Sequence, residues 1–427
     1  MRKNGLRVAL ALTMAMTMSS FDNNVKPAPA DDNSRKEIAL TDGERELVGR
    51  NNEFAFNLFK TMAEKLEVTE KCSCCGASVT SNKSLVISPL SITCALGMLD
   101  NGATGETRDQ INQVLGFGDA GADAINAFAR KMLFEAPTLD NQTKVTMASN
   151  IYVNKGYKLK SAFVKKAKNF YGAQPESRNF ADGETAAYIN RWAADHTDGM
   201  IEEVLSKDEF DPSAVSYLLN AIYFKGAWTE KFDPKNTKNE PFKGGKEVAM
   251  MHQEHEFGYM DDDDCQMLTL PYGNGAYRMT LLLPRENKTL GQVLQGLTAE
   301  TWMARVRTMG KAMVDVKLPR FESKTDESLE RVMAQLGVTK AFDRNVAEFP
   351  AFCNVPTYIS QMKQVARIKL SEEGTEAAAV TVGGVRMLSL APNEPRRVEF
   401  HANRPFLYVI SELSSGAVFF IGQYAGD

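Results

Sequence analysis

Four histidines are the first residues to test for catalysis: His196, His252, His255 and His401. A hydrolase needs a nucleophile, a general base and a group that orients the base. The chain contains no G-x-S-x-G sequence and no Walker A sequence, and GNGAYR at 273–278 lacks the third glycine of a dinucleotide-binding loop. The sequence therefore predicts that the protein is not an enzyme and needs no cofactor.

A metal site is one interpretation of the histidine-rich segment. His252 and His255 lie in HQEH, one residue short of the H-x-x-E-H motif, and Asp261 to Asp264 follow closely. Carboxylates and imidazoles could together bind a divalent ion. We favour the simpler interpretation, a solvated acidic turn, and predict no metal.

The cysteines offer a second interpretation in terms of metal or redox chemistry. Cys72, Cys74 and Cys75 are spaced as thiolate ligands of Zn²⁺ or Cu(I) can be, but a structural zinc site usually has four ligands. Adjacent cysteines pair only with strain. We interpret this cluster as a surface insertion without a catalytic role, and we expect Cys94, in an apolar stretch, to lie in the core.

Composition and the first residues bound the class of protein. The 427 residues carry a net charge of −4, which argues against a nucleic-acid partner. Positive residues followed by the short apolar run 8–18 predict a signal peptide over 1–20, too short to span a membrane. Phe21 stands where a lipoprotein would have cysteine. Residues 21–44 are predicted to be a flexible leader, and no later run predicts a transmembrane segment.

Periodicity predicts the elements that must position any site. Helices dominate the first part and strands the last, which favours an α+β fold. Helices are expected over 52–66 and 91–99, and over 326–336 with Asp326 as its cap. Strands are expected over 214–224, where a continuous apolar run indicates a central strand, and over 313–318, 366–370, 405–411 and 417–422.

The long segment 371–397 is the anomaly of the sequence. Structureless loops of this length are uncommon in compact domains and are usually functional. It begins SEEGTEAAAVTVGG, a composition that suits a strand interior as well as a solvated loop. Side chains alternate in a strand, so one face would carry Thr375, Ala377, Ala379, Thr381, Gly383, Val385 and Met387, none of them charged. The segment could therefore enter a sheet with that face over a core.

Five segments resemble the serpin family of protease inhibitors. EEGTEAAAVT at 372–381 resembles the hinge of the reactive-centre loop in inhibitory serpins. The other four are similar to serpin strands and helices, in serpin order: SPLSITCALGMLDNGATGET at 88–107, LLNAIYFKGAW at 218–228, LPRFESKTDESLERVMAQLGVTKAFD at 318–343 and FHANRPFLYVI at 400–410. The resemblance implies a single serpin domain over 45–427, with three β-sheets, eight or nine helices and an exposed loop.

The resemblance also implies a mechanism. A target protease attacks the loop, forms an acyl-enzyme and is trapped as the cleaved loop inserts into the large sheet. The hinge would be Glu372, Glu373, Gly374, Thr375, Glu376, Ala377, Ala378 and Ala379. Trp228 matches the family's tryptophan where the sheet opens, and Ser88, Ser91, Asn220 and Gln364 match the polar cluster beneath it. The family often has histidine where this chain has Gln364.

Counting along the family's loop places the reactive bond. The specificity residue is usually the seventeenth from the first hinge glutamate, which gives Leu388 and the bond Leu388–Ser389. The segment from Ser389 to Phe400 is longer than in many relatives, so Met387 and Arg386 remain alternatives. Leucine or methionine predicts partners with apolar pockets: chymotrypsin-like, elastase-like or subtilisin-like serine proteases, with papain-like cysteine proteases as a further group.

Two further expectations complete the hypothesis. The signal peptide predicts export, as in exported bacterial serpins, to a secreted, periplasmic or cell-surface location, and we expect a monomer. The alternative function is that of a non-inhibitory serpin, acting as a protease substrate, carrier or chaperone. Such a hinge should contain bulky or charged residues or proline, whereas Thr375 and Ala377 to Ala379 are small.

Overall fold

The computed structural model describes residues 33–66, 68–71, 78–81, 83–243, 246–375 and 396–427, and residues 35–427 form one compact unit. Nine α-helices occur in the described ranges: α1 (Asp42–Leu66), α2 (Pro89–Asp100), α3 (Gly105–Val114), α4 (Gly121–Arg130), α5 (Ser161–Tyr171), α6 (Glu184–His196), α7 (Leu290–Gln295), α8 (Ala299–Thr308) and α9 (Glu330–Leu336). Helix α1 confirms the helix expected over 52–66 but starts earlier, at Asp42, inside the segment predicted to be a leader. None of the nine is both long and apolar enough to cross a bilayer.

Helix α2 shows why the second predicted helix forms and where it goes. The Ser88 side chain accepts a hydrogen bond from the Ser91 backbone N–H, and Pro89 occupies the first turn, as at many helix starts. Every residue of α2 is buried. A helix that is apolar all round belongs in a core, and this one carries the buried Cys94, as predicted.

The strands of the described residues form two large sheets and one hairpin. The six-stranded sheet has the order β12 (Phe321–Ser328), β13 (Gln361–Ser371), β14 (Gly374–Thr375), β6 (Ser216–Ala227), β4 (Thr143–Asn154) and β5 (Glu176–Arg178). The nine-stranded sheet has the order β15 (Arg397–His401), β11 (Gly310–Pro319), β8 (Lys246–Asp261), β9 (Cys265–Tyr272), β10 (Tyr277–Pro284), β16 (Phe406–Glu412), β17 (Val418–Tyr424) and β3 (Leu85–Ile87), with β7 (Lys238–Phe242) paired to β8. Strands β1 (Val68–Lys71) and β2 (Ser78–Ser81) form the hairpin, and Cys72, Cys74 and Cys75 between them lie outside the described residues.

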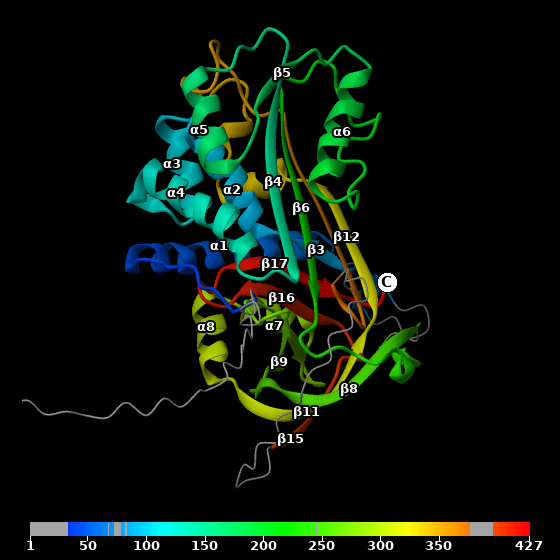
Figure 1. Cartoon of the computed structure of the whole chain (residues 1–427). Coiled ribbons are helices and arrows are strands. Elements are labelled where there is room, and N and C mark those ends of the chain that lie inside the picture. Colours follow the sequence, from blue (N-terminus) through cyan, green and yellow to red (C-terminus); the bar gives the residue numbers. More distant parts are fainter. Residues whose placement is uncertain (1–32, 67, 72–77, 82, 244–245, 376–395) are drawn as a thin grey trace, which may run out of the picture. The chain divides into compact units, whose positions relative to one another are not determined.

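Strand β6 is central, as its apolar run predicts. Its residues alternate between two cores: Leu218 and Ile222 join the large core, whereas Leu219 and Ala221 join a smaller one. Figure 1 shows α1 to α5 on one side of this sheet and α6 on the other. Because both faces are covered, the strand contains hardly any exposed position.

The prediction for Asp326 was wrong. Asp326 lies in β12, not at the start of a helix, and its carboxylate is 2.8 Å from Lys363 Nζ. Helix α9 begins only at Glu330. The alternation of β12, in which Phe321, Ser323 and Thr325 point inward, continues through Asp326 and extends the strand beyond the point where the helix was expected.

Candidate functional site

The two described ends of the long loop belong to different sheets. Gly374 and Thr375 form β14 in the six-stranded sheet, and Arg397 begins β15 at the edge of the nine-stranded sheet. Residues 376–395 between them lie outside the described residues. The hinge residues Glu376, Ala377, Ala378 and Ala379 and the reactive-bond candidates Arg386, Met387, Leu388 and Ser389 are therefore not placed by the structure.

Strand β14 is wedged between β13 and β6. Thr375 pairs with Leu370 on one side and with Gly226 on the other, both antiparallel. Farther along, β13 and β6 pair directly and in parallel, from Gln361 opposite Tyr217 to Ala366 opposite Ile222. The sheet is thus parted at one end by two residues of the loop and closed along the rest of this junction.

Gly374 meets a requirement that no other residue type could satisfy easily. Its φ is +144°, a conformation that side chains disfavour. A Cβ atom there would come within 2.1 Å of the Gly226 carbonyl oxygen. The absence of a side chain at Gly374 therefore lets the loop enter beside β6.

Thr375 points into the protein, as the parity argument predicts. It is fully buried, and its hydroxyl lies 2.7 Å from the Tyr272 hydroxyl. Burial raises the pKa of Tyr272 well above its ordinary value, so this phenol stays neutral and can donate or accept the hydrogen bond with the threonine hydroxyl. Tyr272, at the end of β9, is a residue that sequence reasoning missed, since only its place before Gly273 hints at a strand end.

The two hinge glutamates are held by the segment that follows β6. The Glu372 carboxylate accepts a hydrogen bond from Thr237 Oγ1 at 2.7 Å, and its backbone carbonyl accepts one from Phe232 N at 3.0 Å. Glu373 Oε2 is 2.6 Å from Lys231 Nζ. These contacts fix the turn from β13 into β14, where the predicted hinge begins.

Trp228 lies directly beside the wedge. Its indole N–H donates to the Ser371 carbonyl at 3.0 Å, and its backbone N–H donates to the Glu373 carbonyl at 2.9 Å. The indole also stacks on the Tyr272 ring, with centroids 4.4 Å apart. Trp228 therefore binds both ends of the turn that leads the loop into the sheet.

Ser88, Ser91, Asn220 and Gln364 form one buried polar cluster. Gln364 Nε2 donates to Asn220 Oδ1 at 2.7 Å, and Gln364 Oε1 accepts from Ser88 N at 3.1 Å. The Ser91 hydroxyl also donates to Asn220 Oδ1. Asn220 Nδ2 donates to Ser149 Oγ on β4 at 2.9 Å, which adds Ser149 to the cluster. The cluster joins α2 to β4, β6 and β13 where the sheet is closed.

His252 and His401, two of the histidines singled out in the sequence, contact carboxylates. His252 Nε2 is 2.6 Å from Asp315 Oδ1, and His401 Nε2 is 3.1 Å from Asp315 Oδ2. The acidic turn is neutralised by basic residues, since Arg305 contacts Asp262 at 2.8 Å and Asp264 at 3.1 Å. Within the described ranges, no three His, Cys, Asp or Glu side chains are grouped to hold a metal ion.

Known proteins that resemble this chain belong to the family that its sequence predicts. Residues 49–426 match the family model described as Serpin (serine protease inhibitor). Serpin B6 of Macaca fascicularis is 32% identical over 390 residues, covering 89% of this chain and 99% of the relative. Leukocyte elastase inhibitor of Equus caballus is 31% identical over 401 residues, with the same coverage. The crystal structure of tengpin, a thermophilic serpin in the native state, has a TM-score of 0.78 at 25% identity, covering 92% of this chain and 96% of that chain.

The fold and the site define a protein in which two residues of a long loop pair between two strands of the six-stranded sheet. The chain belongs to the serpin family and has the serpin fold, as its sequence predicts. Membership assigns it to a family of protease inhibitors and not to a class of enzymes.

Proposed function

We propose that the protein is a suicide-substrate inhibitor whose cleaved loop inserts between β6 and β13. A target protease attacks near Leu388–Ser389 and forms an acyl-enzyme, which is trapped as the loop enters the sheet. The observation that carries the proposal is β14. Gly374 and Thr375 already pair with both neighbours, in the antiparallel direction that an inserted strand would need.

The register of β14 predicts where the rest of the loop would go. If residues 376–384 continue the pairing of Gly374 with Ala227 and Ser371, Thr381 comes to lie opposite both Asn220 and Gln364. These two residues already face each other across the closed junction. Both neighbours therefore give the same register, and the inserted strand would fit without a shift of one strand along the other.

Insertion would have to change two contacts that now close the sheet. The first is the hydrogen bond from Gln364 to Asn220, whose place a Thr381 hydroxyl could take. The second is the packing of α6, because Ile189 and Ala193 share a core with Leu219 of β6 and Val365 of β13. Figure 1 shows α6 beside this sheet. These contacts supply a barrier that keeps the intact protein closed.

The target is proposed to be a protease with an apolar primary pocket. Leu388, or Met387 if the site is displaced by one residue, would fill such a pocket. The relative named leukocyte elastase inhibitor supports an elastase-like target. Chymotrypsin-like, subtilisin-like and papain-like enzymes are the other groups to test.

Incubation with a protease panel tests the proposal. Each enzyme is mixed with the protein, and the products are separated by denaturing electrophoresis while the released peptide is weighed by mass spectrometry. We expect a covalent complex with at least one enzyme of apolar specificity and a peptide that starts at Ser389. Cleavage at that bond by every active enzyme, without any complex, would instead identify a non-inhibitory serpin that is a plain substrate.

We further propose that the protein is exported and acts as a monomer. The basic start and the apolar run 8–18 support export. The N-terminal sequence of protein recovered outside the cytoplasm should begin just after residue 19 or 20. Full-length protein confined to the cytoplasm would refute the prediction, and light scattering of the mature protein measures its mass.

A further inference from the structure

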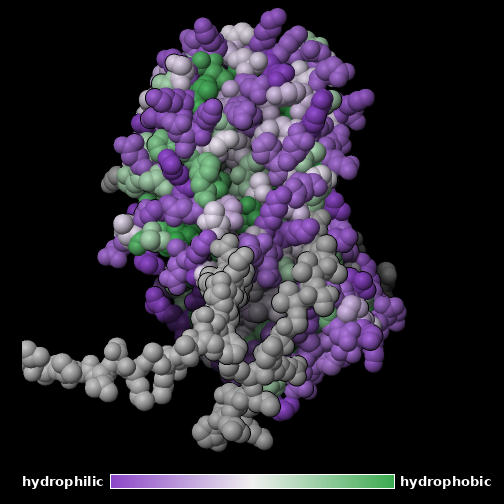
Figure 2. All heavy atoms as spheres, in the orientation of Figure 1, coloured by the Kyte–Doolittle hydropathy of each residue, from purple (hydrophilic) through white to green (hydrophobic). Residues whose placement is uncertain are grey.

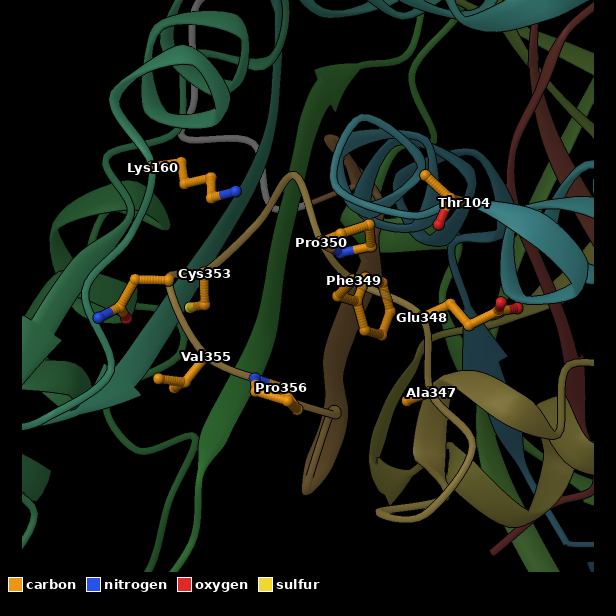
Figure 3. Close-up of a pocket in the computed structure, with 10 residues that line it drawn as sticks. Thr104, Lys160, Ala347, Glu348, Phe349, Pro350, Cys353, Val355 and Pro356 are labelled. Carbon is orange, nitrogen blue, oxygen red and sulfur yellow. The ribbon is translucent and has the colours of Figure 1, made fainter.

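A pocket of about 430 Å³ lies away from the hinge, beside the segment that leads into the opposite end of β13. Residues 347–350 and 353–356 form most of its wall, and Thr104 and Lys160 flank this segment on opposite sides (Figure 3). The volume falls in the range of roughly 300–1,000 Å³ that is typical of small-molecule sites. None of these residues contributes to the proposed inhibitory mechanism.

The wall of the pocket is mainly apolar. Phe349, Pro350, Val355 and Pro356 are among the lining residues, and Val355 is 40% exposed although it is a large hydrophobic residue. The Cys353 thiol is buried there, and burial raises its pKa to about 12, so it is neutral. An apolar ligand would bury the apolar lining of this pocket, part of which is exposed to water, and burial of apolar surface is favourable.

Lys160 supplies the available charge. In Figure 3 its side chain extends over the pocket toward Pro350, whereas the Glu348 carboxylate points away from Cys353 and Val355. Glu348 lies against Gly105, the first residue of α3, where a Cβ atom would be 2.7 Å from Glu348 Oε2. That carboxylate faces the N-terminus of a helix, which favours negative charge. No described carboxylate lies within ion-pair distance of Lys160.

The segment that contains Lys160 is rich in basic residues. Between Asp140 and Glu176 the chain has no acidic residue, although its net charge is −4. Six lysines of this stretch are exposed and form no ion pair with a described carboxylate: Lys155, Lys158, Lys160, Lys165, Lys166 and Lys168. Such a group raises the local concentration of anions near the pocket.

We propose that this pocket binds a free monocarboxylate with an apolar body, of the size of a medium-chain fatty acid. The carboxylate would pair with the Lys160 ammonium, and the hydrocarbon part would pack on Phe349, Val355 and Pro356. Lys160 is a lining residue, and the other lining charge, the Glu348 carboxylate, points away from Cys353 and Val355, so the pocket disfavours a cationic ligand. An uncharged alcohol of equal length would gain the apolar contact but not the ion pair.

Three probes of equal chain length test the proposal by titration calorimetry on the full mature chain, below their micelle concentrations. They are decanoate, decanol and decyltrimethylammonium. We expect decanoate to bind at least tenfold more tightly than decanol, and the cation not to bind. Equal affinity for decanoate and decanol would overturn the assignment of Lys160, and no binding of either would overturn the site.

Matched variants separate the pocket from the general basic surface. Lys160→Gln should weaken decanoate about tenfold and leave decanol unchanged. Lys168→Gln removes the same charge outside the pocket and should change decanoate binding less than twofold. Val355→Asp, at an exposed wall position, should weaken both probes. If the two lysine variants behave alike, decanoate is held only by the basic surface, and the proposed pocket is wrong.

Discussion

Replacing Thr375 by arginine is expected to turn the inhibitor into a substrate. Thr375 is fully buried, and its hydroxyl lies 2.7 Å from that of Tyr272. A guanidinium in this place would be a buried charge without a partner, which costs about 3–5 kcal/mol. The intact variant escapes this cost when residues 374 and 375 leave the sheet, so the cost falls on the insertion step. Since each 1.36 kcal/mol changes a rate tenfold, a cost of about 3 kcal/mol slows insertion by about two orders of magnitude. Hydrolysis of the acyl-enzyme would then be faster than trapping.

The assay is the number of inhibitor molecules consumed per protease molecule inhibited. This stoichiometry should rise by one to two orders of magnitude for Thr375→Arg, while mass spectrometry should find the same cut bond. Thr375→Ser keeps the hydroxyl and should resemble the natural protein. Thr375→Val removes only the hydrogen bond to Tyr272, which is already present before insertion. It should therefore lower the stability of the intact protein by about 1–3 kcal/mol and leave the stoichiometry near the natural value. A stoichiometry within twofold of the natural protein for the arginine variant would refute the role of this hinge.

Four other perturbations test separate parts of the reasoning. A clean cut at the reactive bond should raise the melting temperature, because the inserted strand gains main-chain hydrogen bonds of about 0.5–1.5 kcal/mol each; an equal or lower value would support the non-inhibitory alternative. Leu388→Arg should redirect the inhibitor to trypsin-like enzymes, which should form stable complexes with it. If a trypsin-like enzyme cuts after Arg386 instead, more of the inhibitor should be consumed as substrate. N-terminal sequencing of the released peptide shows which of the two bonds was cut. Thr381→Val should reduce the gain in melting temperature on cleavage without changing that of the intact protein, with Thr381→Ser as control. Burial raises the pKa of Asp100 to about 6, despite the opposing charge of Arg108, so this carboxyl lowers stability as pH rises from about 4 to about 6. Asp100→Asn should therefore stabilise the protein by up to about 3 kcal/mol at pH 7.5 and by little at pH 4, measured by urea unfolding.

Local patterns were sufficient to predict much of the fold. The apolar run of β6 indicates a strand buried on both faces, and the alternation of β11 indicates a strand buried on one face. Burial of this kind can be predicted from the order of apolar and polar residues alone. The same logic predicted that Thr375 points inward, because strand parity depends only on position along the chain. Asp326 shows the limit, since a polar residue before an apolar stripe suits a helix cap and a strand equally well.

Contacts between distant segments could not be predicted in this way. Tyr272 meets Thr375 across 103 positions, and nothing near either residue indicates the other. Ser149 joins the polar cluster only because β4 pairs with β6 in the register that sets it opposite Asn220. Such partners depend on sheet order and register, which a single sequence without repeats leaves open.

The two ends of the loop explain why cleavage should be needed for insertion. Thr375 is fixed in the six-stranded sheet and Arg397 in the nine-stranded sheet, so an intact loop is held at both ends. Each residue that enters the junction between β6 and β13 moves the chain about 3.3 Å farther from Thr375. The residues of the loop that remain outside the sheet must still span the distance back to β15. Arg397 is held there by its ladder partner Met313 and by an ion pair with Glu254. Cutting near Leu388 removes the need to return, whereas the register set by Gly374 and Thr375 remains. Gly374 and Thr375 therefore set the register in which the rest of the loop can enter the sheet. The intact reactive bond prevents that entry, and the protease removes this restraint when it cleaves the bond.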